Sequence, residues 1–205
     1  MKYLYIPAKK KVILETSKIL ELSKKLPKNI ALAYSVQYEN IAKKIKELFS
    51  ESHKITAFLQ VLGCSDLSTL KNTQAVVLVS DGSFHASSLV LRTRLPVYVL
   101  YNNNIRRISE SEIEELRKKK KAVYLKYLNA DRIGILISTK PGQENLKKAL
   151  KFKKNSRKRS YLFLGNNINK NEFENFPVDS WVNTACLRLD LDIPIINLED
   201  LNSCN

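Results

Sequence analysis

Near-continuous apolar runs constrain the fold of this chain more than any other feature of its sequence. Residues 75–79 (AVVLV) and 132–137 (RIGILI) contain almost no polar side chain, and 30–36 (IALAYSV) is similar. Strands that are apolar at nearly every position are typical of parallel sheets, because helices cover both faces of such a sheet. Amphipathic stretches with helical spacing, such as 38–49, lie between these runs. The sequence therefore predicts an α/β protein with parallel sheets that carry helices on both faces.

The alternation of strands and helices restarts near residue 130, which predicts two successive domains. The first would comprise residues 1–129 and the second residues 130–205, each a small unit with four strands. Expected strands cover 30–36, 55–62, 75–79, 96–101, 132–137, 161–164, 180–184 and 194–198, and expected helices cover 10–25, 38–49, 110–128, 143–154 and 170–176. The pattern indicates a duplicated architecture, although the two halves share no strict sequence repeat.

The charge of the chain is strongly basic. Its 205 residues carry a net charge of +15, which fits a nucleic acid, an anionic membrane or an acidic protein as partner. The densest basic runs are 117–121 (RKKKK) and 151–159 (KFKKNSRKR). Charge runs usually form solvated faces, and neither run is interleaved with aromatic residues as a stacking surface requires. We therefore expect neither a nucleic acid nor a membrane as partner.

The cellular compartment is indicated by the amino terminus and the cysteines. No apolar run is long enough to span a bilayer, and the first residues lack the pattern of a secretory signal. The three cysteines are too few and too far apart for a disulfide framework. This usage fits a reducing compartment, so we expect a cytoplasmic protein.

Cys64 and Cys186 are the most informative side chains for chemistry. Cys64 lies in QVLGCSDL and Cys186 in WVNTACLRLDLD, so each follows a strand-like run and precedes a polar turn. Functional groups of open α/β sheets gather beyond the carboxyl ends of the strands, so cysteines at equivalent strand ends of two units could bind one metal centre. Taken singly, each is most simply a small buried hydrophobic residue, as most free cysteines are. Two thiolates are too few for an ordinary iron–sulfur cluster, and Cys204 lies in a polar tail as an incidental terminal residue.

A polar turn follows the strand at 75–79 and is a candidate ligand site. It reads Asp81-Gly82-Ser83-Phe84-His85. Backbone N–H groups and the Ser83 hydroxyl could hold an anion there, and His85 could make a polar contact with a ligand. A plain turn with Phe84 in the core explains the same residues.

Four further residues occupy turns of the same kind. Gln37 and Gln143 follow strands and, taken singly, are most simply turn or capping residues. Arg188 and Asp190 follow Cys186 and could bind a substrate carboxylate and amine, or pair with each other. The sequence contains no GxGxxG, GxxxxGKS/T, GxSxG or HExxH motif, so the usual nucleotide loops, the nucleophile elbow and the zinc helix are not supported.

Taken together, the motifs resemble the archaeal diphthamide synthases, the 2-(3-amino-3-carboxypropyl)histidine synthases. The matching stretches are AYSVQY (33–38), QVLGCSDL (60–67), VLVSDGSFHASSLVL (77–91), GILISTKPGQENL (134–146) and SWVNTACLRLDLDIPIINLEDL (180–201). They occur in family order, and the resemblance extends from Leu14 to Leu201.

The resemblance implies three similar α/β domains, each donating one cysteine to a single 4Fe–4S cluster. The iron without a cysteine ligand would bind S-adenosylmethionine, whose cleavage would yield a 3-amino-3-carboxypropyl radical that adds to a histidine of translation elongation factor 2. Cys64 would be the ligand from the middle domain and Cys186 the ligand from the C-terminal domain. The candidates for cofactor binding are then the turn residues Gln37, Asp81, Gly82, Ser83, His85, Gln143 and Arg188.

The chain also departs from the family pattern. It resembles only the second and third domains, so we expect a separate chain to carry the first domain and the third cysteine. Leu187 stands where the family has a proline after the cysteine, which changes the backbone restraint but not the thiolate. Because the family works as dimers, we expect a homodimer or a heterotetramer.

The expected function is that of a subunit of a split diphthamide synthase, with a basic surface that helps to dock elongation factor 2. Two alternatives stay open. One is a non-catalytic accessory subunit of the same pathway, although such a role would not need both cysteines. The other is a basic nucleic-acid-binding module, whose affinity would fall steeply with salt and would not depend on Cys64.

Overall fold

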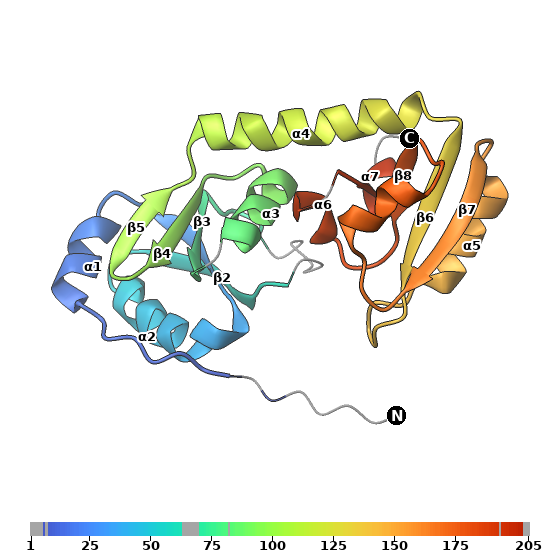
Figure 1. Ribbon diagram of the computed structural model, residues 1–205. Helices are drawn as coiled ribbons and strands as arrows, with labels where there is room; N and C mark the ends of the chain where they lie inside the picture. Colours follow the sequence, from blue (N-terminus) through green and yellow to red (C-terminus); the bar gives the residue numbers. More distant parts are fainter. Residues whose placement is uncertain (1–5, 7, 63–69, 82, 193, 203–205) are drawn as a thin grey trace. The chain divides into compact units, whose positions relative to one another are not determined.

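The computed structural model describes residues 6, 8–62, 70–81, 83–192 and 194–202, which fall into two compact units (Figure 1). Unit 1 comprises Met1–Glu114 and unit 2 comprises Glu115–Asn205. This division falls within helix α4 (Glu110–Leu128). The boundary predicted after residue 129 instead lies just past the end of α4. Both units are α/β, which confirms the predicted fold class.

Unit 1 contains a five-stranded sheet with the order β2-β1-β3-β4-β5. Its strands are β1 (Asn29–Tyr34), β2 (Lys54–Gln60), β3 (Ala75–Val79), β4 (Val97–Tyr101) and β5 (Asn104–Arg107). Its helices are α1 (Thr16–Ser23), the 3-10 helix η1 (Val36–Tyr38), α2 (Glu39–Ser50), α3 (Ser83–Thr93) and the first turn of α4. The first four strands are parallel, as the apolar runs predict.

Strand β5 is a fifth strand that the sequence did not predict, and it pairs antiparallel with β4. It follows a two-residue turn in which Asn102 and Asn103 have φ values of 47° and 56°. Asparagine tolerates this left-handed backbone, which tight hairpin turns require, so the asparagine pair is the sequence signal for the hairpin. The side-chain amide of Asn103 also donates to the Ile13 carbonyl (3.0 Å), which ties the N-terminal segment to the turn.

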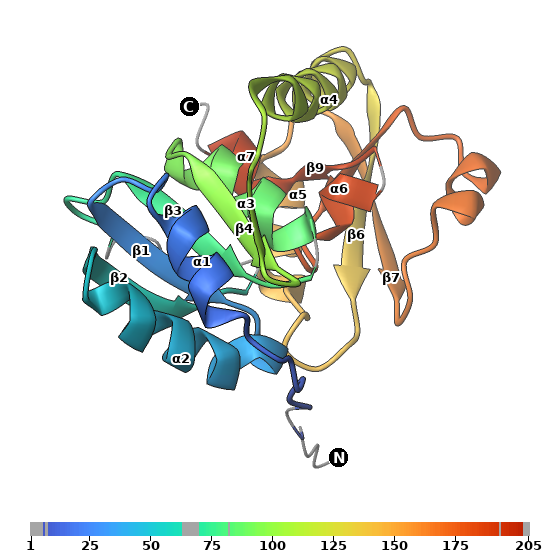
Figure 2. The ribbon, with the colours of Figure 1, turned by 90° about the vertical axis from the view of Figure 1, so that its left-hand side faces the viewer.

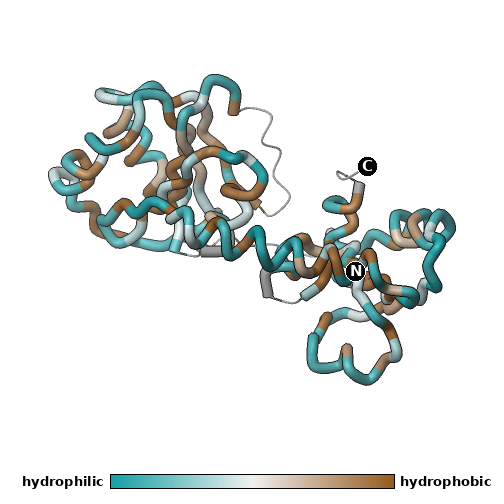
Figure 3. Tube along the Cα trace, turned by 90° about the horizontal axis from the view of Figure 1, so that it is seen from above, coloured by the Kyte–Doolittle hydropathy of each residue, from teal (hydrophilic) through white to brown (hydrophobic). Residues whose placement is uncertain are grey.

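Helices cover both faces of the unit 1 sheet (Figure 2). Val77 and Leu78 are adjacent in β3, so they point to opposite faces, and both are fully buried. Val77 packs with Ile45 of α2 in a cluster that also includes α1, whereas Leu78 packs with Leu89 of α3 in a second cluster. Hydrophobic stretches of the trace accordingly gather at the strands inside the unit, and hydrophilic stretches lie on the surrounding helices and loops (Figure 3).

Unit 2 contains a four-stranded parallel sheet with the order β7-β6-β8-β9. The strands are β6 (Arg132–Ser138), β7 (Arg159–Gly165), β8 (Ser180–Asn183) and β9 (Ile196–Asn197). The helices are the end of α4, α5 (Leu146–Asn155), the 3-10 helix η2 (Lys170–Asn175), α6 (Leu189–Asp192) and α7 (Leu198–Asn202). The last strand is shorter than predicted, because the chain turns into α7 at Leu198.

The two faces of the unit 2 sheet differ in composition. On one face, α4, α5 and α7 pack against β6 through aliphatic residues such as Ile133. On the other face, Trp181 stacks on Phe173 of η2 with ring centroids 4.3 Å apart. The indole also lies against Gly134, where an added Cβ would come within 2.4 Å of the ring. Glycine at this position therefore allows the close approach of Trp181 to β6.

The two units repeat one strand order. In each, the first strand lies between the second and the third, and the fourth follows the third: β2-β1-β3-β4 and β7-β6-β8-β9. With this order the topological switch point lies between the first and third strands, and ligands of open α/β sheets bind outside the carboxyl ends of the strands there. The shared order confirms the expected duplication and locates the two switch points beyond β1 and β3 and beyond β6 and β8.

Candidate functional site

The switch point of unit 2 is formed by the loops that follow β6 and β8. The side-chain amide of Asn145 joins these loops, because it donates to the Thr184 carbonyl (2.8 Å) and to the Gln143 carbonyl (3.4 Å). Thr184 is held in turn by its hydroxyl, which donates to the Leu136 carbonyl of β6 (2.8 Å). The fold therefore brings the loops of the predicted site residues Gln143 and Cys186 to one edge of the sheet.

The loop that carries Cys186 is held by two buried asparagines. Asn183, the last residue of β8, donates to the Cys186 carbonyl (2.9 Å) and to Oδ1 of Asn197 (2.6 Å). Asn197 donates to the Leu187 carbonyl (3.1 Å), and the two asparagines are 1% and 3% exposed. These buried hydrogen bonds fix the backbone around a half-buried, free thiol.

This pair of asparagines was not predicted from the sequence. The signal is present, because Asn183 and Asn197 each end an apolar strand at a buried position. A buried amide side chain is expected to find hydrogen-bond partners, so polar residues at the ends of apolar strands mark loops that the fold holds rigidly.

Asp190 is paired inside unit 2. Its carboxylate, 8% exposed, lies 2.9 Å from Nζ of Lys120 in α4, and Lys120 is also 2.9 Å from Asp200. Burial raises the pKa of Asp190, and Lys120 offsets part of this rise. Burial lowers the pKa of Lys120, but the two carboxylates outweigh it and raise that pKa above its ordinary value. Asp190 thus already has a cation, which favours a structural role over recognition of a substrate amine. Arg188, the other residue predicted in this loop, is exposed.

The switch point of unit 1 is crossed by the N-terminal segment. The N–H of Lys10 donates to the Gln37 carbonyl (2.9 Å), and its Nζ pairs with Asp81 and lies 3.4 Å from the Tyr38 hydroxyl. The hydrogen bond from Lys10 lowers the pKa of Asp81, and the same bond raises the pKa of Lys10. The structure therefore brings Gln37 and Asp81 together through Lys10, a residue that the sequence analysis did not single out.

The other site residues predicted in unit 1 are Gly82, Ser83 and His85, and the last two belong to α3. Ser83 begins this helix and His85, half-buried, lies in its first turn. Gly82 lies outside the described residues.

The two cysteines that were expected to act together do not follow equivalent strands of their units. Cys64 and Cys204 lie outside the described residues. In the sequence, Cys64 comes after β2, the second strand of unit 1, whereas Cys186 comes after β8, the third strand of unit 2. The expectation of equivalent strand ends is therefore wrong, because the counterpart of Cys186 in unit 1 is the turn at Asp81.

In the described part of the chain, no three His, Cys, Asp or Glu side chains lie close enough together to hold a metal ion. None of its helices combines the length and the apolar character that crossing a membrane would need. The convergence of Cys64 and Cys186 on one centre stays a prediction.

The fold and the switch-point loops define a class of α/β protein that is built from repeated doubly wound units. Comparison with known proteins gives the family. The family model of diphthamide synthesis proteins matches residues 1–197, and the chain belongs to this family. The resemblance seen in the sequence motifs is thereby confirmed.

Curated relatives and solved structures agree with this assignment. The chain is 28% identical over 182 residues to the 2-(3-amino-3-carboxypropyl)histidine synthase of Pyrococcus horikoshii, and the match covers 82% of this chain and 53% of the relative. It is 26% identical over 208 residues to the enzyme of the same name from Methanocaldococcus jannaschii, covering 94% of this chain and 57% of the relative. The chain thus spans a little over half the length of the curated relatives it matches.

Two solved structures of Dph2 from Pyrococcus horikoshii share the fold. One superposes with a TM-score of 0.78 at 24% identity, covering 93% of this chain and 62% of the other. The second, determined with a 4Fe–4S cluster, superposes with a TM-score of 0.77 at 26% identity, covering 94% and 63%.

Proposed function

We propose that this chain is a subunit of a split diphthamide synthase. The complex would transfer a 3-amino-3-carboxypropyl group from S-adenosylmethionine to a histidine of elongation factor 2. The observation that carries the proposal is the family match over residues 1–197 together with a free, half-buried thiol, Cys186, at a switch-point loop. The enzyme names of the curated relatives support the reaction class.

The donor chemistry of the chain fits a 4Fe–4S cluster. Cysteine thiolates are the usual ligands of such clusters, and Cys186 is unpaired in a loop that its neighbours hold rigidly. When bound, the cluster would supply the electron for reductive cleavage of a carbon–sulfur bond. Cys64 is the second thiolate of the proposal, and a third would come from polypeptide outside these 205 residues. The structure of the Pyrococcus relative with a cluster supports this cofactor.

The chain's own residues would bind and orient S-adenosylmethionine. Loops at switch points are the usual ligand sites of this fold, and Gln143, Gln37 and Asp81 lie on them. Arg188 is exposed near Cys186, and its guanidinium suits the carboxylate of the methionine moiety. The other proposed contacts are Gly82, which lies outside the described residues, and Ser83 and His85 of α3.

We further propose that a separate chain supplies the remaining domain and the third cysteine. Support comes from the curated relatives, of which this chain matches 53% and 57%. The assembled enzyme would be a heterotetramer if it keeps the dimeric state of the family, and the net charge of +15 would steer it towards acidic faces of elongation factor 2 in the cytoplasm.

Anaerobic co-expression with a candidate first-domain protein tests the proposal. We expect a brown complex that contains iron and modifies elongation factor 2, and Cys64→Ser and Cys186→Ser should each abolish both properties. Cys204→Ser is the matched control and should change neither. A tight complex without iron would reject the catalytic role in favour of an accessory subunit, and iron retained in both cysteine variants would reject the assignment of the ligands.

A further inference from the structure

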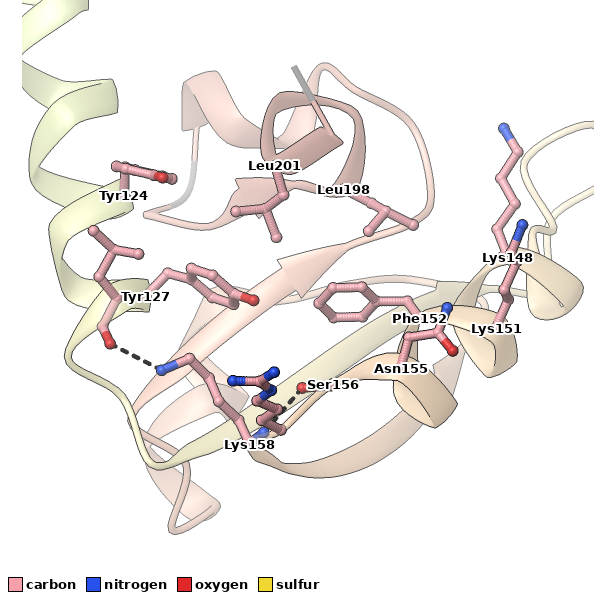
Figure 4. Close-up of a pocket in the computed structure, with 12 residues that line it drawn as sticks. Tyr124, Tyr127, Lys148, Lys151, Phe152, Asn155, Ser156, Lys158, Leu198 and Leu201 are labelled. Atoms are coloured by element: carbon pink, nitrogen blue, oxygen red, sulfur yellow. Dashed lines mark hydrogen bonds between the residues drawn. The ribbon is translucent and has the colours of Figure 1, made fainter. Parts of the chain in front are cut away.

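A groove in unit 2 lies apart from the switch point. It is bordered by the end of α4, α5 and α7 and has a volume of about 1080 Å³ (Figure 4). Leu128 and Lys158 line it and precede β6 and β7, so the groove lies at the amino ends of these strands, whereas Gln143 and Cys186 follow carboxyl ends. This volume lies at the upper end of the roughly 300–1,000 Å³ that small-molecule pockets span. We call it the α5 groove.

Three half-buried aromatic side chains line the α5 groove. Tyr124 and Tyr127 come from α4, and Phe152 comes from α5. Figure 4 shows the rings of Tyr127 and Phe152 pointing towards each other across the groove, with Leu198 and Leu201 of α7 beside them. Rings that face a groove are the stacking surfaces on which nucleobases bind without sequence preference.

Basic side chains surround these rings. Lys148, Lys151 and Arg157 line the groove and are exposed. Among the described residues, no acidic side chain lines the groove and no carboxylate pairs with these three cations. The segment 147–159 contains eight Lys or Arg residues and no Asp or Glu. Such a field attracts a polyanion.

Lys158 has a different role. Its Nζ donates to the carbonyl of Leu128, the last residue of α4 (2.9 Å), and to that of Ala130 (2.6 Å). The same ammonium lies 5.3 Å from the centre of the Tyr127 ring. Lys158 therefore fixes the wall of the groove that carries Tyr127, and the cations available to a ligand are those of α5 and Arg157.

We propose that the α5 groove binds single-stranded nucleic acid. The bases would stack against Tyr127 and Phe152, and the phosphates would lie at Lys148, Lys151 and Arg157. An acidic peptide would satisfy the cations, but its carboxylate side chains offer no aromatic face to stack on the rings. The expectation of no nucleic acid rested on the view that aromatic residues are not interleaved with the basic runs as a stacking surface requires. The fold removes this objection, because it places Tyr124 and Tyr127 of α4 in the same groove as Phe152, which lies within the run 151–159.

The test measures binding of a fluorescein-labelled oligouridylate of 12 nucleotides to the full chain by fluorescence anisotropy over a salt series. We expect Lys148→Gln/Lys151→Gln to weaken binding and to reduce the slope of log K against log salt by about 1.4, since each lost phosphate contact of a single strand contributes about 0.7. Lys153→Gln/Lys154→Gln, on the same helix with the same change in charge, is the control and should leave most of the affinity. Phe152→Leu keeps an apolar side chain and should weaken binding at least about fivefold, because each stacked base is worth about 1–3 kcal/mol.

Three results would overturn the proposal. The first is an equal loss of affinity in the two lysine pairs, which would show a diffuse charge effect. The second is equally tight binding of an abasic 12-mer with the same number of phosphates, which would remove the stacking component. The third is tighter binding of a labelled 12-residue polyglutamate, which would assign the groove to acidic protein segments.

Discussion

Asn183 and Asn197 bond to each other, side chain to side chain, at 2.6 Å beneath the loop that carries Cys186. Each also holds a carbonyl of that loop, Asn183 that of Cys186 and Asn197 that of Leu187. The orientation of the thiol therefore depends on two residues that would never contact a ligand themselves. In the proposed enzyme they act as positioning residues.

Asn183→Ala tests this dependence. We expect a loss of about 1–3 kcal/mol in the free energy of unfolding, because the amide of Asn197 loses its buried partner. Urea denaturation measures the loss, and iron content of the co-expressed complex measures the effect on Cys186. The exposed Asn166→Ala is the control and should leave both unchanged. Full iron content in a destabilised Asn183→Ala protein would show that the asparagine pair stabilises unit 2 without positioning the thiol.

The contact between Gly134 and Trp181 gives a second prediction. A Cβ at position 134 would lie 2.4 Å from the indole ring, so Gly134→Ala requires the ring or the strand to move. Overpacking of this kind costs about 1–3 kcal/mol, and thermal unfolding should show a lower Tm. Gly165→Ala, in the adjacent strand β7, is the matched control because its Cβ would meet nothing closer than 3.4 Å. An equal effect of the two substitutions would contradict the steric explanation.

How far the sequence predicts this fold depends on the range of the interactions involved. The strands β3 and β6 follow from local composition, because every residue of AVVLV and nearly every residue of RIGILI is apolar and buried. Helix α4 is predicted at 110–128 and observed as Glu110–Leu128. In contrast, β5 depends on a turn signal at Asn102 and Asn103 that hydrophobic periodicity does not detect.

The candidate site was predicted less completely, because its contacts join residues that are distant in sequence. Gln37 and Asp81 could be located at strand ends from the sequence, but Lys10, which bonds to both, comes from the N-terminal segment and carries no local signal. The strand order, which separates the positions of Cys64 and Cys186, likewise depends on pairings between strands that are far apart along the chain. Local patterns do not determine such pairings.

The start of α4 gives a prediction about pH. The hydroxyl of Ser109 accepts from the Glu112 N–H (3.2 Å), and the Glu112 carboxylate accepts from the Ser109 N–H (2.9 Å), which is a capping box. The hydrogen bond from the Ser109 backbone, with those from Arg106 and the Ser109 hydroxyl, lowers the pKa of Glu112 from 4.5 to about 2. Because the folded state binds the proton less readily, this contribution to stability is present above pH 4.5 and is lost as the pH falls through 2.

Glu112→Gln should therefore flatten the dependence of stability on pH within this acidic window. Urea denaturation of wild type and variant from pH 5 downwards measures it, and Glu114→Gln, exposed on the same helix, is the control. Ser109→Ala should cost about 1 kcal/mol at neutral pH, since it removes the helix cap. Parallel curves for wild type and Glu112→Gln would contradict the role of the carboxylate.

The ion pair of Lys120 and Asp190 gives the last prediction. In Lys120→Met the Asp190 carboxylate, 8% exposed, loses the cation that lies 2.9 Å away. Breaking a buried pair costs about 3–5 kcal/mol, and we expect about 1–3 here because the Lys120 side chain is 36% exposed to screening solvent. The pKa of Asp190, already raised by burial, should rise further without Lys120. A raised carboxyl pKa means that the folded state holds the proton more tightly, so the variant should recover stability as the pH falls towards and below that pKa.

Asp190→Asn in the Lys120→Met background removes the unpaired charge and should restore much of the loss at neutral pH. Asp200→Asn in the same background should not, because Asp200 is 45% exposed. Equal rescue by the two asparagines would show that the loss comes from the packing of Lys120 and not from the charge of Asp190.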